Sequence, residues 1–473
     1  MSDDSLHILV FPWLAFGHML PFLELSKSLA KRAHRITYVS TPRNIQRLRQ
    51  TQPDLSPLIH FLSFPLPSVK HLPQAAEDTR EIPIEKVGYL KKAFDGLEAP
   101  FSAFFKSACA DKSTRLDWVI IDFAPHWVPN IAQEHGVPCT LFSVFAATTS
   151  VFMGPCSELI GGSRTSPKDF TVSPSWVPFP SNLALRPHEA RFIPYFYAKN
   201  ESDISDAERL ATVISRSKFV CVKSSYSHES KWLSLLSKLF EKEVVPVGLL
   251  PPSIDKDKSP IKKSTTALGE VDVIDWLDQR PAESVLYIAF GSEAALSIEL
   301  LHELALGIEM SKVPFIWALR KPTSVSEDTR ILPEGFEERT KDIGVVTGWV
   351  PQMRVLAHAS VGGHLTHCGW SSVVENFQFG HPLVQLPICN DQGLNDRILE
   401  EKMVGLVVPR DDETGDFSRE DVAKVVRVLM EEEEGKVIRH NAKQLKEIFA
   451  NRASHEKHID DFVEKLKKFK QDV

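Results

Sequence analysis

Residues 349–392 have the sequence WVPQMRVLAHASVGGHLTHCGWSSVVENFQFGHPLVQLPICNDQ. Residues 361–366 mix β-branched, glycine and apolar residues, a pattern that predicts a short buried strand. A glycine-containing turn at 367–370 follows, and a helix is expected over the segment that starts at Ser371. A strand, a tight turn and a helix N-terminus in this order form a phosphate site in α/β folds, because the first helix amides point outward and the helix dipole favours an anion.

Side chains of this stretch add hydrogen-bond donors at the same place. His367 and the hydroxyls of Ser371 and Ser372 all lie in or next to the turn. An alternative interpretation is that Ser372 and Glu375 form a capping box, which requires no ligand. Two flanking groups favour a ligand: residues 349–352 follow an expected strand at 344–347, and residues 391–392 follow one at 382–387. Ligands bind at the carboxyl ends of the strands of a doubly wound sheet.

The whole 44-residue stretch resembles the donor-binding signature of the plant family-1 UDP-glycosyltransferases, which glycosylate small molecules. This resemblance implies that Trp349 stacks on uracil, that Gln352 holds the nucleoside and that Glu375 binds the ribose hydroxyls. Ser371 stands where the family usually has asparagine, and serine is shorter and lacks the amide donor. The remaining donor-binding residues implied are His367 and Ser372 at the diphosphate, Trp370, Asp391 and Gln392 at the transferred sugar, and Val350 beside Trp349.

Length and composition restrict the class of protein. A chain of 473 residues predicts two to three domains, and a formal net charge of −7 argues against a broad nucleic-acid surface. No apolar run is long enough to span a membrane, and the acidic start Met1–Asp4 is a poor secretory signal. The six cysteines include no C-x-x-C pair, which indicates reduced thiols. We therefore expect a cytoplasmic monomer without nucleic-acid or membrane partners.

Short apolar runs alternate with helical periodicity along the chain and predict two parallel sheets. Residues 155–200, by contrast, are rich in proline, serine and aromatic residues and predict a long, elaborated loop region. Residues 249–265 have the composition of a linker. The expected strands are 6–11, 36–40, 118–121, 139–144, 219–222 and 244–248 before this linker, and 285–289, 315–319, 344–347, 361–366, 382–387 and 405–408 after it.

The expected organisation is therefore an α/β chain with domains at 1–248 and 266–445 joined by a linker at 249–265; the resemblance implies that the first domain binds the acceptor and the second the UDP-sugar. The resemblance implies the GT-B fold, in which two Rossmann-like, doubly wound domains face each other across a cleft. It also implies that the terminal segment 446–473 packs back on the N-terminal domain. Periodicity alone predicts only that this segment is an amphipathic helix.

Two residues near expected strand ends are candidates for catalysis. His18 follows the first strand in an expected loop, and Asp122 directly follows the strand at 118–121. A carboxylate that accepts from one imidazole nitrogen fixes the tautomer and stabilises the imidazolium, so that the other nitrogen can take a proton. The alternatives are a structural histidine and an aspartate that caps the helix expected over 127–133. The pair matches the His and Asp dyad of the family.

The resemblance implies inverting glycosyl transfer. An acceptor hydroxyl, deprotonated by His18, attacks the anomeric carbon in line with the departing UDP. The charge on the leaving diphosphate is then stabilised by the helix N-terminus that follows Trp370 and by three side chains, those of His367, Ser372 and Ser292. No metal is expected: His364 and His367 are three apart in a strand and point to opposite faces. No further cofactor is expected either, because the UDP-sugar is a co-substrate.

Rival classes can be tested on the same sequence. No two glycines are separated by a single residue, which excludes the G-x-G-x-x-G fingerprint of dinucleotide oxidoreductases. The P-loop motif G-x-x-x-x-G-K-[ST] is also absent. A non-catalytic sugar-nucleotide sensor on the same fold remains as an alternative. Such a sensor could lose His18 or Asp122 without cost, and both are present.

The donor sugar and the acceptor are predicted from softer matches. Asp391 and Gln392 by resemblance favour UDP-glucose, with UDP-rhamnose as the second candidate. Three segments, FPWLAFGHMLPFLELSK, STPRNIQRL and PVGLLPP, resemble the plant branch that extends sugars on terpenoid or flavonoid glycosides. Each acceptor-pocket candidate has core or loop packing as its alternative; the candidates are Phe123, Trp127, Phe142, Phe145, Phe152, Arg191, Tyr195 and Phe196.

Overall fold

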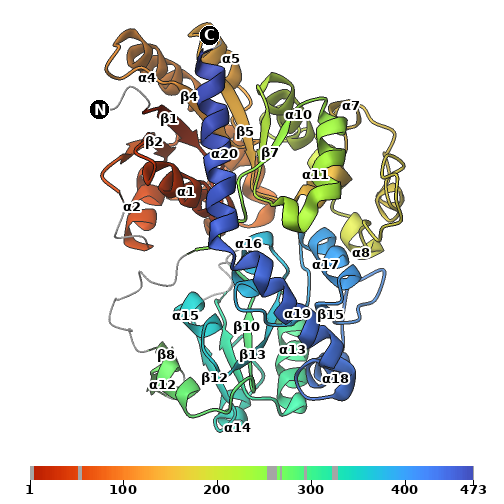
Figure 1. Cartoon of the computed structure of the whole chain (residues 1–473). Helices are drawn as coiled ribbons and strands as arrows, with labels where there is room; N and C mark the ends of the chain where they lie inside the picture. The colour runs from red at the N-terminus through yellow and green to blue at the C-terminus, as the bar shows by residue number, and fades with distance from the viewer. Residues whose placement is uncertain are drawn as a thin grey trace. The chain divides into compact units, whose positions relative to one another are not determined.

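The computed structural model describes residues 5–51, 56–252, 264–266, 269–291, 296–321 and 329–471 (Figure 1). The chain divides into two compact units. The first unit comprises Met1–Ser166, Phe192–Leu250 and Arg452–Val473, and the second comprises Pro167–Arg191 and Pro251–Asn451. Within the described ranges, no helix is both long and apolar enough to cross a membrane.

The first unit is built on a seven-stranded sheet in the order β3-β2-β1-β4-β5-β6-β7, and all of its neighbouring strands are parallel. Six of these strands lie where the sequence predicts them. The edge strand β3 was not predicted, because its side chains are mostly half-exposed or exposed and it lacks an apolar run. The strands are β1 His7–Phe11, β2 Arg35–Ser40, β3 Ile59–Ser63, β4 Trp118–Ile121, β5 Cys139–Ser143, β6 Val220–Val222 and β7 Val244–Pro246.

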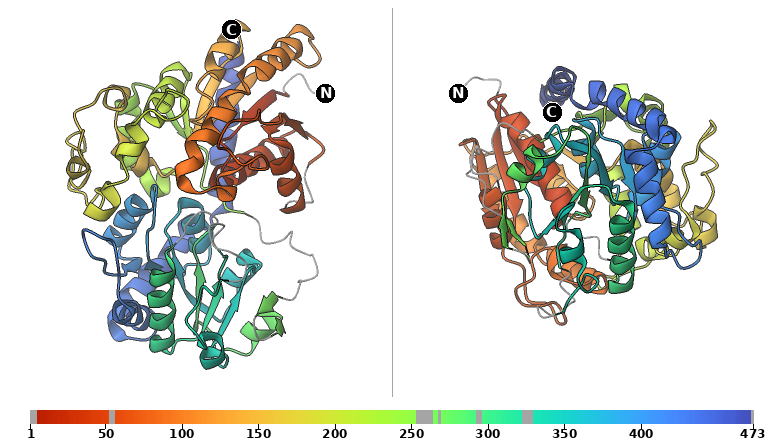
Figure 2. Two further views of the ribbon diagram at one scale, coloured as in Figure 1. Left: turned by 180° about the vertical axis from the view of Figure 1, so that it is seen from behind. Right: turned by 90° about the horizontal axis from the view of Figure 1, so that it is seen from below.

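Helices cover both faces of this sheet (Figures 1 and 2). Ile8 and Val10 of β1 share one core with α1 and with the terminal helix α20. Phe11 points to the other face, where its ring lies 5.1 Å from that of Phe94 in α3 and 5.5 Å from that of Phe101 in α4. The helices are α1 Phe16–Ala30, α2 Pro42–Thr51, α3 Val87–Asp95, α4 Glu98–Ala110, α5 Val128–Glu134, α6 Ala147–Met153, α7 Cys156–Leu159, α9 Pro194–Tyr197, α10 Asp206–Arg216, α11 Tyr226–Phe240 and α20 Arg452–Gln471, with 3-10 turns at Thr79–Glu81 and Ile84–Lys86.

The second unit repeats the pattern with a six-stranded parallel sheet in the order β12-β11-β10-β13-β14-β15. All six strands are among those predicted. The short antiparallel pair β8 and β9 was not predicted. The strands are β8 Ser264–Thr266, β9 Gly269–Val271, β10 Val285–Ala289, β11 Phe315–Ala318, β12 Gly344–Thr347, β13 Val361–Thr366, β14 Leu383–Gln385 and β15 Gly405–Val407.

Alternate residues of β10 point to opposite faces of this second sheet. Leu286 and Ile288 share a core with α13 and α18, whereas Val285 and Tyr287 share one with α12 and α15. Both faces are therefore covered, as the continuous apolar runs predicted. The helices are α8 Pro187–Ala190, α12 Val273–Asp278, α13 Ile298–Ser311, α14 Phe336–Thr340, α15 Gln352–Leu356, α16 Trp370–Phe377, α17 Gln392–Glu401, α18 Arg419–Met430 and α19 Lys436–Phe449, with 3-10 turns at Pro167–Phe170 and Glu433–Gly435.

The segment Pro167–Arg191 belongs to the second unit, which corrects the expected domain range 1–248. The guanidinium of Arg186 pairs with the buried carboxylate of Asp396 in α17. Arg397 Nε donates to the carbonyl of Ala184 at 3.3 Å, and Arg191 Nη2 donates to that of Thr414 at 3.2 Å. These partners are more than 200 residues apart in the chain, so no local pattern could reveal them.

The terminal helix α20 is anchored in the core of the first unit. Phe462 and Leu466 are fully buried there, and the indole nitrogen of Trp118 in β4 donates to the carbonyl of Leu466 at 2.9 Å. The ring of Phe462 also lies edge-on to that of Phe219, 6.1 Å away. The helix is therefore part of the core of this unit and not only a surface appendage.

Phe462→Ala should destabilise the first unit by about 3–5 kcal/mol, because it removes a large ring from a filled core. For a unit of this size, this corresponds to a fall in melting temperature of about 6–20 °C, measurable by circular dichroism. Glu464→Ala, at an exposed position of the same helix, is the matched control and should melt like the wild type. Equal melting of both variants would contradict the role of α20 in the core.

Candidate active site

His18 and Asp122 lie side by side at the carboxyl edge of the first sheet. His18 Nδ1 is 2.7 Å from Asp122 Oδ2. The sequence analysis expected His18 in a loop, but it lies in the first turn of α1. Asp122 directly follows β4, which pairs with β1 in register Phe11↔Ile121. Adjacent parallel strands thus bring together two residues that are far apart in sequence.

Asp122 is held by the main chain as well as by the imidazole. Its Oδ2 accepts from the amide of Trp13 at 3.1 Å, and its Oδ1 accepts from its neighbour Phe123 at 2.7 Å. The alternative role as a helix cap is not what the structure shows: α5 has Trp127 as its N-cap, with no side-chain cap bond. The carboxylate is therefore directed at His18.

This arrangement fixes the tautomer of His18. A carboxylate can only accept, so the bond places a proton on Nδ1 and leaves Nε2 as the basic nitrogen. The Asp122 side chain is only 3% exposed, whereas that of His18 is 13% exposed. A buried acceptor behind a partly exposed imidazole is the arrangement that stabilises an imidazolium after proton transfer.

Two of the predicted acceptor-pocket residues flank His18. The ring of Phe145 lies edge-on to the imidazole, with 5.4 Å between the centroids, and that of Phe123 is 5.9 Å away. Both rings are half-buried, so each has surface to offer a ligand. The environment of His18 is therefore apolar on two sides.

Three other acceptor candidates are core residues. Phe142 is fully buried against Phe22, at a centroid distance of 4.8 Å, and Trp127 packs among Phe11 and Phe101. Phe152 is likewise fully buried. For these three, the alternative of core packing accounts for the side chain, because a fully buried ring has no surface for a ligand.

The last three acceptor candidates lie outside this cluster. Arg191 is in the second unit, where its guanidinium donates to the main-chain carbonyls of Glu413 and Thr414. Tyr195 in α9 is 76% exposed, and Phe196 packs edge-on against Tyr197 at 5.3 Å.

In the second unit, the predicted strand, turn and helix are all present. Strand β13 ends at Thr366, Cys368 has a left-handed backbone with φ +65°, and α16 begins at Trp370. The N-cap of α16 is Gly369, and no side chain caps it. The capping-box interpretation was therefore wrong: Ser372 lies inside the helix. The uncapped amides of the first turn are suited to an anion.

His367 lies over this turn and against the end of the neighbouring strand β10. A Cβ atom on Gly291 or Gly369 would come within 2.9 Å or 2.6 Å of the His367 ring, so both glycines are needed for its placement. Burial lowers the pKa of His367 to about 4. The imidazole is therefore neutral near pH 7 and can act as a hydrogen-bond donor without adding a buried positive charge.

The predicted nucleoside residues lie at the N-terminus of α15 and on α16. Trp349 is 51% exposed, and so has a ring face to offer a base, while Val350 beside it is buried. Gln352 Nε2 donates to Glu375 Oε2 at 2.5 Å. The two residues predicted to hold the nucleoside and the ribose are thus bonded to each other.

The predicted sugar residues are arranged differently from the expectation. Gln392 is 5% exposed, and its Oε1 accepts from the amides of Ile388 and Cys389 at 2.9 and 3.0 Å, so its carbonyl holds its own loop. Trp370 is also buried and lies edge-on to Phe449. Asp391, by contrast, is half-buried at the N-cap of α17.

Asn395 is a polar residue of this region that sequence analysis missed. Its buried Nδ2 donates to Asp391 Oδ2 at 2.8 Å and to the carbonyl of Cys368 at 3.0 Å. One amide therefore joins the sugar-side carboxylate to the turn before α16. Asn395 is four residues after Asp391, a spacing that brings two side chains together at the start of a helix; because no helix was predicted over this segment, the pair could not be found from sequence.

Ser292 lies outside the described residues. In the described part of the chain, no three histidine, cysteine, aspartate or glutamate residues form a group that could hold a metal ion. Ser371 and Ser372 are half-buried in the first turn of α16.

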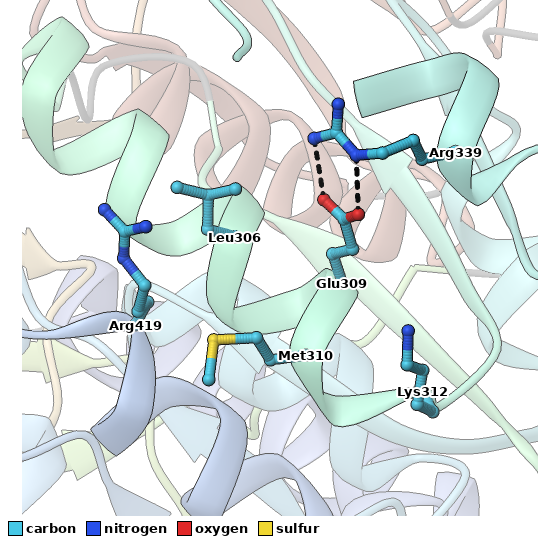
Figure 3. A pocket seen from close by; sticks show the side chains of 6 residues that line it. All are labelled: Leu306, Glu309, Met310, Lys312, Arg339 and Arg419. Carbon is cyan, nitrogen blue, oxygen red and sulfur yellow. Dashed lines mark hydrogen bonds and ion pairs between the residues drawn. The ribbon is translucent and has the colours of Figure 1, made fainter. Parts of the chain in front are cut away.

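A separate surface pocket of about 440 Å³ lies on α13, α14 and α18 (Figure 3). None of the predicted site residues lines it. Its charged groups are largely paired: Arg339 makes two bonds to Glu309, at 2.7 and 2.9 Å, and Arg419 pairs with Glu303. The pocket therefore lacks a cluster of polar groups aimed at a ligand. It is lined by Leu306, Glu309, Met310, Lys312, Arg339 and Arg419.

Known proteins resemble this chain over nearly its whole length. A family model described as UDP-glucoronosyl and UDP-glucosyl transferase matches residues 263–457. UDP-glycosyltransferase 91C1 of Arabidopsis thaliana is 43% identical over 98% of this chain and 96% of its own. The chain belongs to the plant UDP-glycosyltransferase family. The soyasaponin III rhamnosyltransferase of Glycine max is 39% identical over 99% of this chain and 97% of its own.

The fold agrees with this family. A UDP-glucosyltransferase from Polygonum tinctorium capable of glucosylating indoxyl has a TM-score of 0.75 to this chain, with 26% identity over 99% of this chain and 100% of its own. The two parallel-sheet units are those of the GT-B glycosyltransferases. As a member of the family, this UDP-glycosyltransferase transfers a sugar from a UDP-sugar to plant natural products.

Asp122→Asn should lower the turnover of this UDP-glycosyltransferase by about 10²-fold or more, because an amide still accepts hydrogen bonds but cannot stabilise an imidazolium. Turnover per folded molecule and melting temperature are measured together. Asp117→Asn is the matched control: Asp117 also accepts a main-chain amide, from His7 at 2.7 Å, but at the amino end of the sheet. An early-melting Asp122→Asn variant with an unchanged rate per folded molecule would indicate a purely structural aspartate.

Proposed function

We propose that this enzyme transfers glucose from UDP-glucose, with inversion, to a hydroxyl of a small plant natural product, and that this hydroxyl belongs to a sugar already attached to a terpenoid or flavonoid. The observation that carries the proposal is the bond between His18 Nδ1 and Asp122 Oδ2. A non-catalytic sugar-nucleotide sensor would have no use for a buried carboxylate that fixes the tautomer of a partly exposed histidine.

In the proposed reaction, the acceptor hydroxyl donates its hydrogen bond to His18 Nε2. As the oxygen attacks the anomeric carbon, its proton moves to Nε2, and the carboxylate of Asp122 stabilises the imidazolium that forms. The new bond forms opposite the departing diphosphate, so the configuration inverts. The half-buried rings of Phe123 and Phe145 are suited to the apolar part of an acceptor.

The leaving UDP carries its developing charge on the β-phosphate. The uncapped N-terminus of α16 supplies main-chain amides there, and Ser372 and the neutral His367 supply side-chain donors. Such oriented donors stabilise charge that develops in the transition state without reorganising. The proposal therefore requires no metal and no further cofactor.

Glucose is favoured as the donor sugar because of Asp391. Its half-buried carboxylate, held by Asn395, can accept from sugar hydroxyls. Rhamnose has a methyl group in place of the hydroxymethyl group of glucose, so it lacks the 6-hydroxyl. A site built to bind a hydroxyl rejects an analogue without it, since its polar groups are left unpaired.

UDP-rhamnose is the second candidate donor, and one observation favours it. The relative from Glycine max that is 39% identical over almost the whole chain has the name soyasaponin III rhamnosyltransferase. The side-chain carbonyl of Gln392 accepts from amides of its own loop. The proposal therefore assigns the discrimination between the two sugars to Asp391.

The first test is His18→Ala. This variant should lose transfer by about 10²–10⁴-fold, because the general base is missing. Binding of UDP, measured by calorimetry, should stay unchanged, because His18 is placed on the acceptor side of the reaction. Products of a panel of plant glycosides are detected by mass spectrometry. Near-normal turnover of the variant would contradict the dyad, and UDP binding by a wild type that transfers to no acceptor would favour the sensor.

The second test compares donors. The wild type should have a higher kcat/KM with UDP-glucose than with UDP-rhamnose. Asp391→Ala should cost about 10–100-fold with UDP-glucose, the factor of a hydrogen bond to a charged group, and less with UDP-rhamnose. Asp412→Ala removes an exposed carboxylate of the same unit and is the control. A wild-type preference for UDP-rhamnose would overturn the choice of glucose and leave the reaction type standing.

A further inference from the structure

A chain of three hydrogen-bonded side chains runs from the core of the second unit to its predicted nucleoside site. The hydroxyl of Tyr287 in β10 donates to Gln352 Oε1 at 2.9 Å. Gln352, the first residue of α15, donates through Nε2 to Glu375 Oε2 at 2.5 Å. Each residue comes from a different element, so the chain joins β10, α15 and α16.

Tyr287 is the fixed end of this chain. It is fully buried in the centre of the sheet, where β10 pairs with β13 in register Tyr287↔His364. The two rings stack with centroids 5.0 Å apart and planes 26° apart. Val355 and Leu356 of α15 pack in the same core. A ring held in this way can place its hydroxyl with little freedom.

The carboxylate of Glu375 sets the direction of the chain, because it accepts from the Gln352 NH₂ group and leaves Oε1 to accept from Tyr287. Burial raises the pKa of Tyr287, so the hydroxyl keeps its proton and donates. Burial also lowers the pKa of His364 to about 3, so this imidazole carries no charge near pH 7. Glu375 is thus the acceptor at the outer end, and the side chains behind it in the chain are neutral.

The amide of Gln352 has two orientations related by a flip, and only one is useful here. With Oε1 on the tyrosine hydroxyl, the NH₂ group faces the carboxylate of Glu375; after a flip, an oxygen would face that carboxylate and repel it. The carboxylate of Glu375 therefore selects the orientation, and the hydroxyl of Tyr287 fixes the position of the amide by donating to the oxygen that this orientation turns toward it.

We infer that Tyr287 is a positioning residue for the UDP part of the donor: it fixes the Gln352 amide, which in turn aims the Glu375 carboxylate at the ribose hydroxyls. This inference rests on the proposed function, in which Gln352 and Glu375 bind the nucleoside. Because the chain ends at the nucleoside, it acts alike on UDP and on every UDP-sugar. Its loss removes uniform binding, which raises KM and leaves kcat unchanged.

The test is Tyr287→Phe, which removes one oxygen and keeps the buried ring. The Kd for UDP and the KM values for UDP-glucose and UDP-rhamnose should all rise by the same factor of about 3–10, as expected for one hydrogen bond, with kcat within about twofold of the wild type. Thr340→Val is the matched control: it removes another buried hydroxyl of the same unit, which donates to the carbonyl of Phe336 at 2.9 Å. This control should bind UDP like the wild type.

A double-mutant cycle separates positioning from mere destabilisation. In a Gln352→Ala background, Tyr287→Phe should cause no further loss of UDP affinity, because the tyrosine acts through that amide. Additive losses, or a change in kcat alone, would overturn the inference. Unchanged UDP affinity in Tyr287→Phe would overturn it too, while leaving the donor site intact. A wild type that does not bind UDP would overturn the proposed donor site together with the inference.

Discussion

Both candidate sites depend on the point in each parallel sheet where the strand order reverses. In the first unit this point lies between β1 and β4, and in the second between β10 and β13. The connections that leave two such neighbouring strands run to opposite faces, so a crevice opens at their carboxyl ends. His18 and Asp122 occupy that position in the first sheet, and His367 lies against Gly291 at the same position in the second. Strand order therefore decides which distant residues can meet.

The elements that create these positions could be predicted from sequence because buried parallel strands are short, continuous apolar runs. Both strands at each reversal point, β1 with β4 and β10 with β13, lie where the pattern places them. Helix starts were less accurate: α1 begins at Phe16, so His18 lies in its first turn and not in a loop, and α16 begins at Trp370, one residue before the expected Ser371. The first turn of a helix resembles a loop in sequence. Its amides lack intrahelical partners, and its residues need not follow the apolar periodicity of the rest of the helix.

Contacts between side chains could not be predicted, because they depend on tertiary packing. Tyr287 looks like any strand residue until the register beside His364 and the position of Gln352 are known. The same limit applies to the aromatic acceptor candidates. Phe142 and Phe145 are three residues apart and chemically identical, yet one is sealed in the core and the other lies edge-on to His18. Phe142 lies within β5 and Phe145 two residues past its end, so the difference depends on where the strand stops.

Neutral groups form the part of the second unit that is suited to an anion. His367 is buried and uncharged near pH 7, and the turn before α16 contributes main-chain amides. A buried cation in this place would be left without a partner whenever the site was empty, at a cost of several kcal/mol. Amide dipoles and a neutral imidazole carry no such penalty, and they are still suited to an anion. The one charged group in the chain from Tyr287, Glu375, lies at its outer end, where a sugar hydroxyl and not a phosphate would meet it. In the proposed function, this separation puts neutral donors toward the phosphates and an acceptor toward the ribose, which is the order in which a UDP-sugar presents its groups.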